Sequence, residues 1–152
     1  MPILLSFLLY CFSVVPYYGS ISLQSNVVTY YPMPAEYYNA ARFLAHVNKA
    51  GSVFDELSKD DIVIVTYPDR SQKYVVIEIK RYIDLYPQSP NMDAGKVSYV
   101  DMNGNGLTAY DVANQVYNTR GLLVLQTCLP DKPGRLFVIA RPVEGKRGMR
   151  RR

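Results

Sequence analysis

The hydrophobic residues of the chain fall mainly into short runs that alternate with polar positions, which is the pattern of half-buried β-strands. Strands are predicted at residues 20–31, 61–67, 73–82, 96–100, 122–125 and 136–140. Turn residues separate the second run from the third, so these two are expected to form a β-hairpin. Within the third run, Val76 and Ile77 make one double apolar step that departs from strict alternation.

Helices are indicated by capping signals at two places. Ser52 stands at an N-cap position with Asp55 three residues later, which predicts a short helix there. Thr108 and Asp111 make the same pair before apolar residues at helical spacing. Residues 36–47 are ambiguous, because they begin with helix formers and end in an apolar run. Many short strands with two or three short helices are typical of a mainly β fold, and we expect a small closed β-barrel.

The length and composition are those of one globular domain. At 152 residues, with 49% hydrophobic and 20% charged residues, the chain can bury a single core. The net charge is +4, and six basic side chains against Glu144 give residues 141–152 a charge of +5. The rest has 11 basic and 12 acidic groups, so the body is nearly neutral. The basic end lacks aromatic residues, and we interpret residues 144–152 as a solvated, disordered tail rather than a site for nucleic acid or anionic lipid.

The N-terminal segment is the most apolar part of the chain. Residues 3–15 contain no charged side chain and are followed by Pro16. These 13 residues are fewer than the roughly 20 that cross a bilayer as a helix. The run suits the apolar region of a signal peptide or a marginal membrane anchor, although no Lys or Arg precedes it and a buried strand would look similar. The expected organisation is a signal or anchor segment at residues 1–16, a barrel at residues 17–143 and the basic tail.

The main candidate for chemistry is a thiol at the end of a predicted strand. The apolar run at residues 122–125 continues through Gln126 and Thr127 to Cys128, and the chain then turns. Arg135 opens the next strand. A thiol in this position faces an edge of the sheet, where a neighbouring cation favours the reactive thiolate, and an arginine can donate to a carbonyl oxygen that gains charge. The alternatives are a small buried cysteine and a strand-end arginine in water.

The chain has a single histidine, so cysteine–histidine chemistry has one possible partner for each thiol. His46 lies in an apolar stretch that ends at a turn. Alternation places Leu44 and His46 on one face and Ala45 and Val47 on the other. A histidine in such a setting is either a satisfied core residue or a proton-transfer group, and the sequence leaves both readings open.

Together these features resemble sortases, the cysteine transpeptidases of Gram-positive-type cell surfaces. The resemblance rests on Leu-x-Thr-Cys at residues 125–128, an arginine that opens the next strand, and Ala-His followed by Gly-x-Val-Phe-x-x-Leu within residues 45–57. It covers roughly residues 20–143. The chain departs from the family at Ala45 and at Asp60, where sortases usually have glycine. The fold that the resemblance implies is a small closed sortase-like β-barrel.

The resemblance also implies a reaction. Cys128 would attack the carbonyl of a C-terminal sorting signal of the Leu-Pro-x-Thr-Gly kind, and His46 would protonate the leaving amine. Arg135 would hold the substrate and the oxyanion, with support from Thr127. An amine from a cell-wall precursor or a pilin lysine would then resolve the thioester, without a cofactor or metal.

A cellular location and an alternative function complete these expectations. The family places such a protein on the extracellular face of the cell membrane, here attached through the N-terminal apolar segment. The alternative is a catalytically degenerate barrel that binds a peptide or serves as a surface structural module.

Two further motifs need an interpretation of their own. Residues 101–106 imitate the start of a calcium loop, but position 12 is Val112 rather than a carboxylate, so a tight turn before the Thr108 cap is favoured. Arg141 is the alternative to Arg135 as the family arginine, although it follows the last strand instead of opening it.

Overall fold

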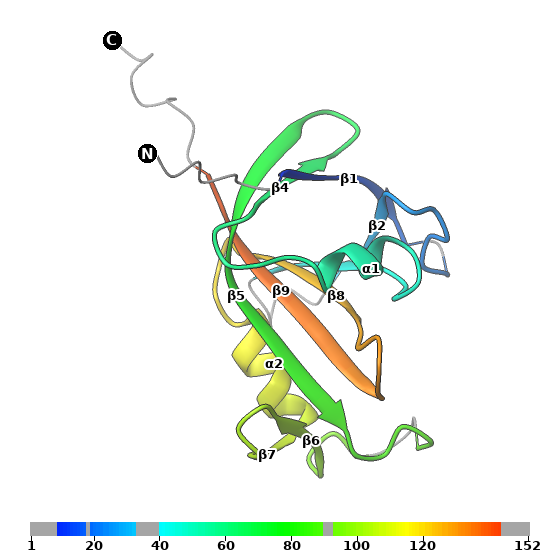
Figure 1. Cartoon of the computed structure of the whole chain (residues 1–152), viewed down its shortest axis with the longest axis vertical. Coiled ribbons are helices and arrows are strands. Elements are labelled where there is room, and N and C mark those ends of the chain that lie inside the picture. The colour runs from blue at the N-terminus through cyan, green and yellow to red at the C-terminus, as the bar shows by residue number, and fades with distance from the viewer. Residues whose placement is uncertain (1–8, 18, 33–39, 90–92, 144–152) are drawn as a thin grey trace, which may run out of the picture.

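A computed structural model describes residues 9–17, 19–32, 40–89 and 93–143 of the chain. The described part is built mainly from strands, with two helices (Figure 1). In chain order the elements are β1 Leu9–Pro16, β2 Val27–Tyr30, β3 Ala41–Leu44, α1 Ala50–Phe54, β4 Ile62–Thr66, β5 Ser71–Asp84, β6 Val97–Asp101, β7 Gly106–Thr108, α2 Ala109–Tyr117, β8 Leu123–Cys128 and β9 Gly134–Pro142.

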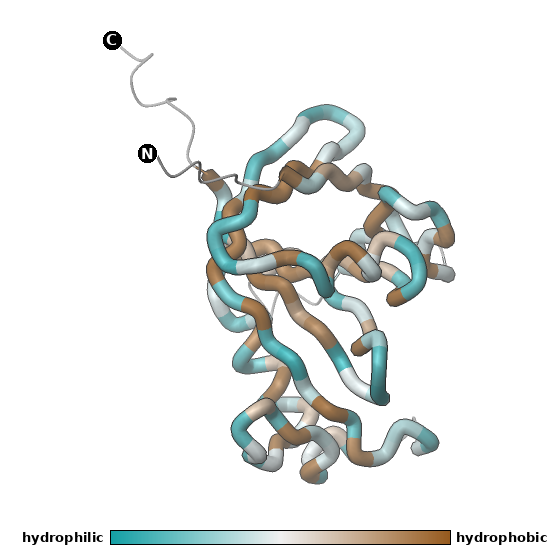
Figure 2. Tube along the Cα trace, in the orientation of Figure 1, coloured by the Kyte–Doolittle hydropathy of each residue, from teal (hydrophilic) through white to brown (hydrophobic). Residues whose placement is uncertain are grey.

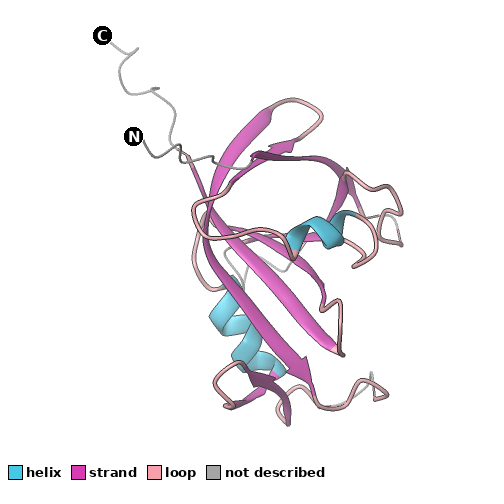
Figure 3. Ribbon diagram, viewed as in Figure 1, coloured by secondary structure: helices cyan, strands magenta, loops and turns pink. Residues whose placement is uncertain are grey.

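The strands form a closed barrel with a short extension. Hydrogen bonding runs in the order β4-β1-β2-β3-β8-β9-β5-β6-β7, and β4 also pairs with β5. That last pairing closes a ring of seven strands and leaves β6 and β7 as a continuation of the sheet beyond β5. Figure 3 shows the long strands β5 and β9 side by side, with the β6–β7 extension at one end of β5. The prediction of a mainly β fold with a closed barrel is confirmed.

The apolar N-terminal run supplies a strand of this barrel. Leu9–Pro16 pairs in parallel with β2 and with β4, so it belongs to the barrel and not, as predicted, to a separate segment before it. Phe12 is buried with its ring centroid 5.4 Å from that of Phe54, so one side of the run packs on the core. A buried strand was the alternative to a signal peptide or anchor that the composition of this run left open. Residues 1–8 and 144–152, which hold the rest of the expected anchor and the tail, lie outside the described residues.

The part of the chain before α1 differs most from the prediction. Of residues 20–31, only β2 is a strand, because the polar residues at 24–26 make a turn in which Val27 N donates to the Gln24 carbonyl at 3.4 Å. The apolar half of the ambiguous stretch at residues 36–47 forms β3. The composition of this segment allowed either a helix or a strand, and pairing in the sheet made its apolar half a strand.

The hairpin predicted from alternation is confirmed, and its double apolar step has a structural cause. β4 and β5 pair in antiparallel fashion. The pairing of β5 with β9 shifts register between Val76 and Glu78, which leaves Ile77 as a bulge. Because of this extra residue, both apolar side chains are used: Val76 is buried in the barrel core and Ile77 packs on the outer cluster beside α2.

Helix α2 and the turn before it follow the sequence signals. Asp111 N donates to Thr108 Oγ1 at 3.0 Å, and Thr108 N donates to Asp111 Oδ2 at 2.9 Å, which is the predicted capping box. The calcium-like sequence is a tight turn in which Asp101 Oδ1 accepts from Asn103 N and Asn105 N, both at 2.9 Å. These bonds, the backbone bond from Asn105 first, hold the pKa of the Asp101 carboxyl below its usual range.

Helix α1 begins two residues earlier than predicted. Ser52 lies inside the helix and donates from its hydroxyl to the Lys49 carbonyl at 2.7 Å, so it is not the N-cap. The chain enters the helix through a tight turn in which Lys49 N and Gly51 N both donate to the His46 carbonyl at 3.0 Å. Backbone bonds to His46 take the place of the side-chain cap that the sequence suggested.

Two hydrophobic clusters lie on opposite faces of the wall formed by β8 and β9. Alternate residues of a strand face opposite sides, so each strand contributes to both clusters. The barrel core takes Leu123, Leu125, Leu136 and Val138, whereas the outer cluster takes Val124, Phe137 and Ile139. Val112 and Val116 of α2 cover the outer cluster. Figure 2 shows hydrophobic residues along β9 and β1 and hydrophilic residues in many of the connecting loops.

Candidate active site

Cys128 and Arg135 lie opposite each other on neighbouring strands. They are partners in the antiparallel pairing of β8 with β9. Arg135 Nη1 donates to Cys128 Sγ at 3.8 Å and to the carbonyl of Gly134 at 3.1 Å. Cys128 is free and exposed, and Arg135 is half-buried. The predicted thiol and guanidinium therefore meet at the end of the β8–β9 wall, and the buried-cysteine reading is excluded.

The thiol lies on the outside of the barrel. Leu125 is buried in the barrel core, and Thr127, two residues later, is also buried. Val124 belongs to the outer cluster, so Gln126 and Cys128 continue its face. α2 covers Val124, and the Tyr117 hydroxyl of this helix donates to Gln126 Oε1 at 2.5 Å. Beyond Gln126 the strand runs out from under the helix, which leaves Cys128 open to solvent.

The strand that leads to His46 runs beside β8 in the same direction. β3 pairs in parallel with β8 up to Leu44 opposite Gln126, and Ala45 N then donates to the Gln126 carbonyl at 3.1 Å. Ala45 is buried in the barrel core. His46 follows Leu44 by two residues, as Cys128 follows Gln126, and the chain turns at His46. The parallel pairing thus carries the half-buried imidazole and the thiol to the same end of the barrel.

Thr127 supports this arrangement from the inside of the barrel. Its hydroxyl is buried and donates to the Ala45 carbonyl at 2.7 Å. A hydroxyl committed to that carbonyl does not point to the outer face, so direct support of an oxyanion, as the sequence suggested, does not fit its position. Instead it fixes the backbone immediately before His46.

Gly51 completes the support for His46. A Cβ at this position would collide with Thr127 Oγ1 and would lie 2.5 Å from the His46 carbonyl oxygen. We expect Gly51→Ala to lower the free energy of unfolding by about 1–3 kcal/mol, since an overpacked site must shift its neighbours. The shift also moves the His46 backbone, because the His46 carbonyl oxygen is the second atom that the added Cβ would meet. Urea unfolding of the variant and of the parent chain tests this.

The matched control for Gly51→Ala is Ser52→Ala. Ser52 is exposed on the same helix, and its hydroxyl donates to the Lys49 carbonyl at 2.7 Å. This variant should keep the free energy of unfolding within about 0.5 kcal/mol of that of the parent chain. Equal losses in the two variants would mean that the helix, and not the contact with His46, is what matters.

β5 pairs with β9 on the side away from β8 and brings Tyr82 beside Arg135. Tyr82 of β5 is the partner of Arg135 on one side and of Asp101 on the other. Its hydroxyl donates to Gln115 Oε1 of α2 at 2.7 Å, and its ring centroid lies 5.8 Å from that of Phe137. Burial, followed by the nearby carboxylates, raises the pKa of Tyr82 to about 12. Tyr82 therefore joins α2 to the wall that holds Arg135.

The raised pKa of Tyr82 predicts a loss of stability at alkaline pH. An unfolded tyrosine titrates near pH 10, so between about pH 10 and pH 12 the unfolded chain releases this proton while the folded chain keeps it. The stabilising contribution of Tyr82 is therefore fully present below about pH 10. The free energy of unfolding should decline as the pH rises from about 10 to 12. Burial and the bond to Tyr74 raise the pKa of Tyr67 as well, with the same sign.

Urea unfolding at a series of pH values checks this prediction. Tyr82→Phe should have a shallower decline than the parent chain, whereas Tyr110→Phe, whose side chain is 60% exposed, should not. Parallel curves for the parent and Tyr82→Phe would contradict it.

The two candidate arginines lie at different distances from Cys128 along β9. Arg141 is exposed on β9 opposite Val75, six residues from Arg135 along the strand, and is not near Cys128 in the sheet.

Within the described chain, no group of three or more His, Cys, Asp or Glu side chains could hold a metal ion. Likewise, no helix of the described residues has the length and apolarity needed to span a membrane.

Sequence reasoning did not assign functional roles to Gly51 and Tyr82. Gly51 was visible only as part of a turn, and its contact with Thr127 depends on how α1 packs against β8. Tyr82 looked like any strand tyrosine, since its place beside Arg135 follows from the pairing of two strands more than 50 residues apart. No short sequence pattern indicates the packing of Gly51 against Thr127 or the place of Tyr82 beside Arg135.

Comparisons with known proteins identify the fold. No protein-family model matches the chain, and no curated protein is similar to it in sequence. Clostridium perfringens sortase C, solved with the C-terminal cell wall sorting motif, has a TM-score of 0.52 at 14% identity and covers 87% of this chain and 63% of its own. Group B Streptococcus pilus island 1 sortase C2 has a TM-score of 0.51 at 16% identity, with coverages of 90% and 66%. Sortase C1 from Streptococcus suis has a TM-score of 0.51 at 13% identity, with coverages of 90% and 65%.

These likenesses establish the fold and not the reaction. The chain spans less than two thirds of the length of these three proteins. At such low identities a shared structure says how the strands are arranged, and activity must be argued from the site. The sortase-like β-barrel expected from the sequence is confirmed.

Proposed function

Because the chain has a sortase-like fold, we propose that it is a cysteine transpeptidase that cleaves a C-terminal sorting signal of the Leu-Pro-x-Thr-Gly kind. The observation that carries this proposal is the 3.8 Å contact between Arg135 Nη1 and Cys128 Sγ on the outer wall of the barrel. An exposed thiol beside a fixed guanidinium is suited to nucleophilic attack on a carbonyl. The proposed catalytic residues are Cys128, His46 and Arg135.

The first half of the reaction forms a thioester. The Cys128 sulfur attacks the carbonyl carbon of the Thr–Gly bond, and Arg135 donates hydrogen bonds to the oxygen as it gains charge. The new S–C bond replaces the C–N bond, and the leaving amine takes a proton from the His46 imidazolium. Because Arg135 is held by the Gly134 carbonyl as well as the thiol, its position requires little rearrangement for this role.

The second half returns the enzyme to its starting state. An amine, from a cell-wall precursor or a pilin lysine, attacks the thioester carbon and gives its proton to His46. The new amide bond replaces the S–C bond, and the Cys128 thiolate leaves. Splitting one transacylation into two steps in this way is the general advantage of a covalent intermediate.

The proposal extends to partners and location. The donor would be a surface protein with a sorting signal, by analogy with the sorting motif named for the Clostridium perfringens structure. The reaction would then take place at the extracellular face of a Gram-positive-type cell membrane.

Product analysis with a peptide panel tests the proposed function. The chain is incubated with fluorogenic peptides that contain Leu-Pro-x-Thr-Gly variants, with and without triglycine or a lysine peptide as acceptor. We expect cleavage between Thr and Gly and a ligated product that forms only with acceptor. Binding of the peptides without cleavage or ligation would instead support the alternative, a catalytically degenerate barrel that acts as a peptide-binding module.

A further inference from the structure

Arg42 of β3 has the only buried side-chain nitrogen or oxygen without a hydrogen-bond partner among the described residues. The atom is Nε of the guanidinium. Arg42 also belongs to no ion pair in the part of the chain that the structure describes. Leaving a buried donor unpaired is unfavourable, so such a group normally meets an acceptor. The side chain as a whole is half-buried, so Arg42 remains within reach of a bound molecule.

Two tyrosine rings hold the Arg42 guanidinium on the outer face of the barrel. Its Cζ lies 4.3 Å from the ring centroid of Tyr31 and 5.7 Å from that of Tyr117. Phe43 is in the barrel core, so Arg42 faces the opposite side, where Tyr117 is part of the outer cluster. Cation–π contacts fix the position of a guanidinium, and its planar set of N–H donors remains suited to a carboxylate.

The register of β3 relates Arg42 to the proposed reaction centre. Arg42 is opposite Val124 in the pairing with β8, and Val124 is four residues before Cys128. At about 3.3 Å per residue, the two levels are roughly 13 Å apart along the wall. An extended peptide has nearly the same rise, so with its scissile carbonyl at Cys128 its side chain four residues earlier reaches the level of Arg42. In a Leu-Pro-x-Thr-Gly signal cleaved after threonine, that residue directly precedes the leucine.

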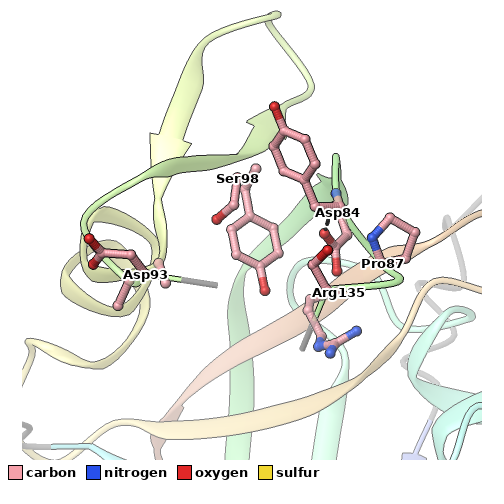
Figure 4. Close-up of a pocket in the computed structure, with 10 residues that line it drawn as sticks. Asp84, Pro87, Asp93, Ser98 and Arg135 are labelled. Atoms are coloured by element: carbon pink, nitrogen blue, oxygen red, sulfur yellow. Dashed lines mark hydrogen bonds between the residues drawn. The ribbon is translucent and has the colours of Figure 1, made fainter. Parts of the chain in front are cut away.

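The cavity of about 270 Å³ beside Arg135 offers no comparable group (Figure 4). Two carboxylates in its lining, Asp84 and Asp93, accept backbone N–H groups of their own turns, each at 2.9 Å. None of the residues that line it has a buried polar side-chain atom without a partner. The stronger indication of a bound group is therefore at Arg42.

We infer that Arg42 binds the carboxylate of an acidic residue in the donor peptide, at the position directly before the Leu-Pro-x-Thr-Gly motif. The carboxylate supplies an opposite charge and an acceptor for the N–H donors of the guanidinium. The inference rests on the proposed function for the identity of the donor peptide. It adds a preference that lies outside the motif itself.

Turnover of two matched peptides tests this preference. The peptides are Glu-Leu-Pro-Ala-Thr-Gly and Gln-Leu-Pro-Ala-Thr-Gly, capped at both ends, with triglycine amide as an acceptor that carries no carboxylate. We expect the parent chain to have a kcat/KM about fivefold higher for the glutamate peptide, and this ratio to fall to about one in Arg42→Gln. Arg42→Lys should keep part of the preference, because lysine retains the charge without the planar fork. Equal kcat/KM for both peptides in the parent chain, or an unchanged ratio in Arg42→Gln, would overturn the inference.

Two controls separate recognition at Arg42 from a general effect of charge. Arg70 also lies over a tyrosine ring, 4.4 Å from the centroid of Tyr67, and Arg70→Gln should leave the ratio at its parent value. A peptide with the glutamate moved three residues further from the leucine should react like the glutamine peptide. A ratio lost equally in both arginine variants, or an equal preference for the displaced glutamate, would mean that net charge and not Arg42 selects the peptide.

Binding to Cys128→Ala tests the site without turnover. The readout is the NMR signal of the Arg42 Nε–H group, identified by its loss in Cys128→Ala/Arg42→Lys. This signal should shift on titration with the glutamate peptide and stay in place with the glutamine peptide. Turnover of the parent chain with neither the shift nor the preference would reject the role of Arg42 and leave the transpeptidase proposal intact. The shift in a protein whose parent chain shows no turnover would reject the transpeptidase and retain Arg42 as a carboxylate site.

Discussion

Replacing Cys128 by alanine is expected to remove turnover completely, by a factor of at least about 10⁴. The reason is that Cys128 Sγ is the nucleophile that Arg135 Nη1 contacts, and a thioester cannot form without the sulfur. The fold should survive, because Cys128 is exposed and its side chain is not part of either hydrophobic cluster. Turnover of the fluorogenic peptide and thermal unfolding are measured on the same sample.

Cys11→Ala is the matched control, since Cys11 is also free and exposed but lies on β1. It should retain full turnover. Turnover that persists in Cys128→Ala, or that disappears in Cys11→Ala with the fold intact, would remove Cys128 from the proposed mechanism.

Replacing Arg135 by lysine is expected to reduce kcat/KM by about 10²–10³. Lysine keeps the charge but not the planar fork, so it cannot hold the Gly134 carbonyl and the developing oxyanion in the same geometry. Arg135→Gln should lose at least as much. Stability should change little in either variant, because Arg135 is half-buried and forms no ion pair among the described residues.

Arg141→Lys tests whether the position on β9 matters. Arg141 lies on the same strand, opposite Val75 and exposed. This variant should keep kcat/KM within a factor of about two. A loss comparable to that of Arg135→Lys would mean that the strand register does not identify the functional arginine.

The sequence predicted those parts of the fold that have a local cause. Thr108 and Asp111 form their capping box with each other, so a four-residue pattern was enough to place α2. The β4–β5 hairpin joins neighbours in the chain, and its alternation specified which side faces the core. Even the irregular step at Val76 and Ile77 was visible, although its cause, a bulge against β9, was not.

The prediction was wrong where distant pairing decides the structure. β1 is an apolar run that pairs in parallel with β2 and β4, and nothing within the run distinguishes such a strand from an export signal. Ser52 has the sequence of an N-cap, but the turn at His46 starts α1 two residues earlier. In the first case pairing between distant strands overrode the local preference, and in the second a local backbone turn did so.

The candidate site was predictable in its residues and not in its geometry. The antiparallel return from Cys128 to Arg135 is a short connection, so their pairing could be expected from spacing. The approach of His46 to the same end depends on the parallel pairing of β3 with β8, about 80 residues apart in the chain.

The intact mass of the chain after incubation with a Leu-Pro-x-Thr-Gly peptide, in the absence of amine, tests the central claim most directly. The account predicts a mass increase equal to the peptide through its threonine, located at Cys128 by peptide mapping and released by hydroxylamine. An adduct that persists on Cys128→Ala, or peptide cleavage that proceeds with no adduct on the parent chain, would contradict it.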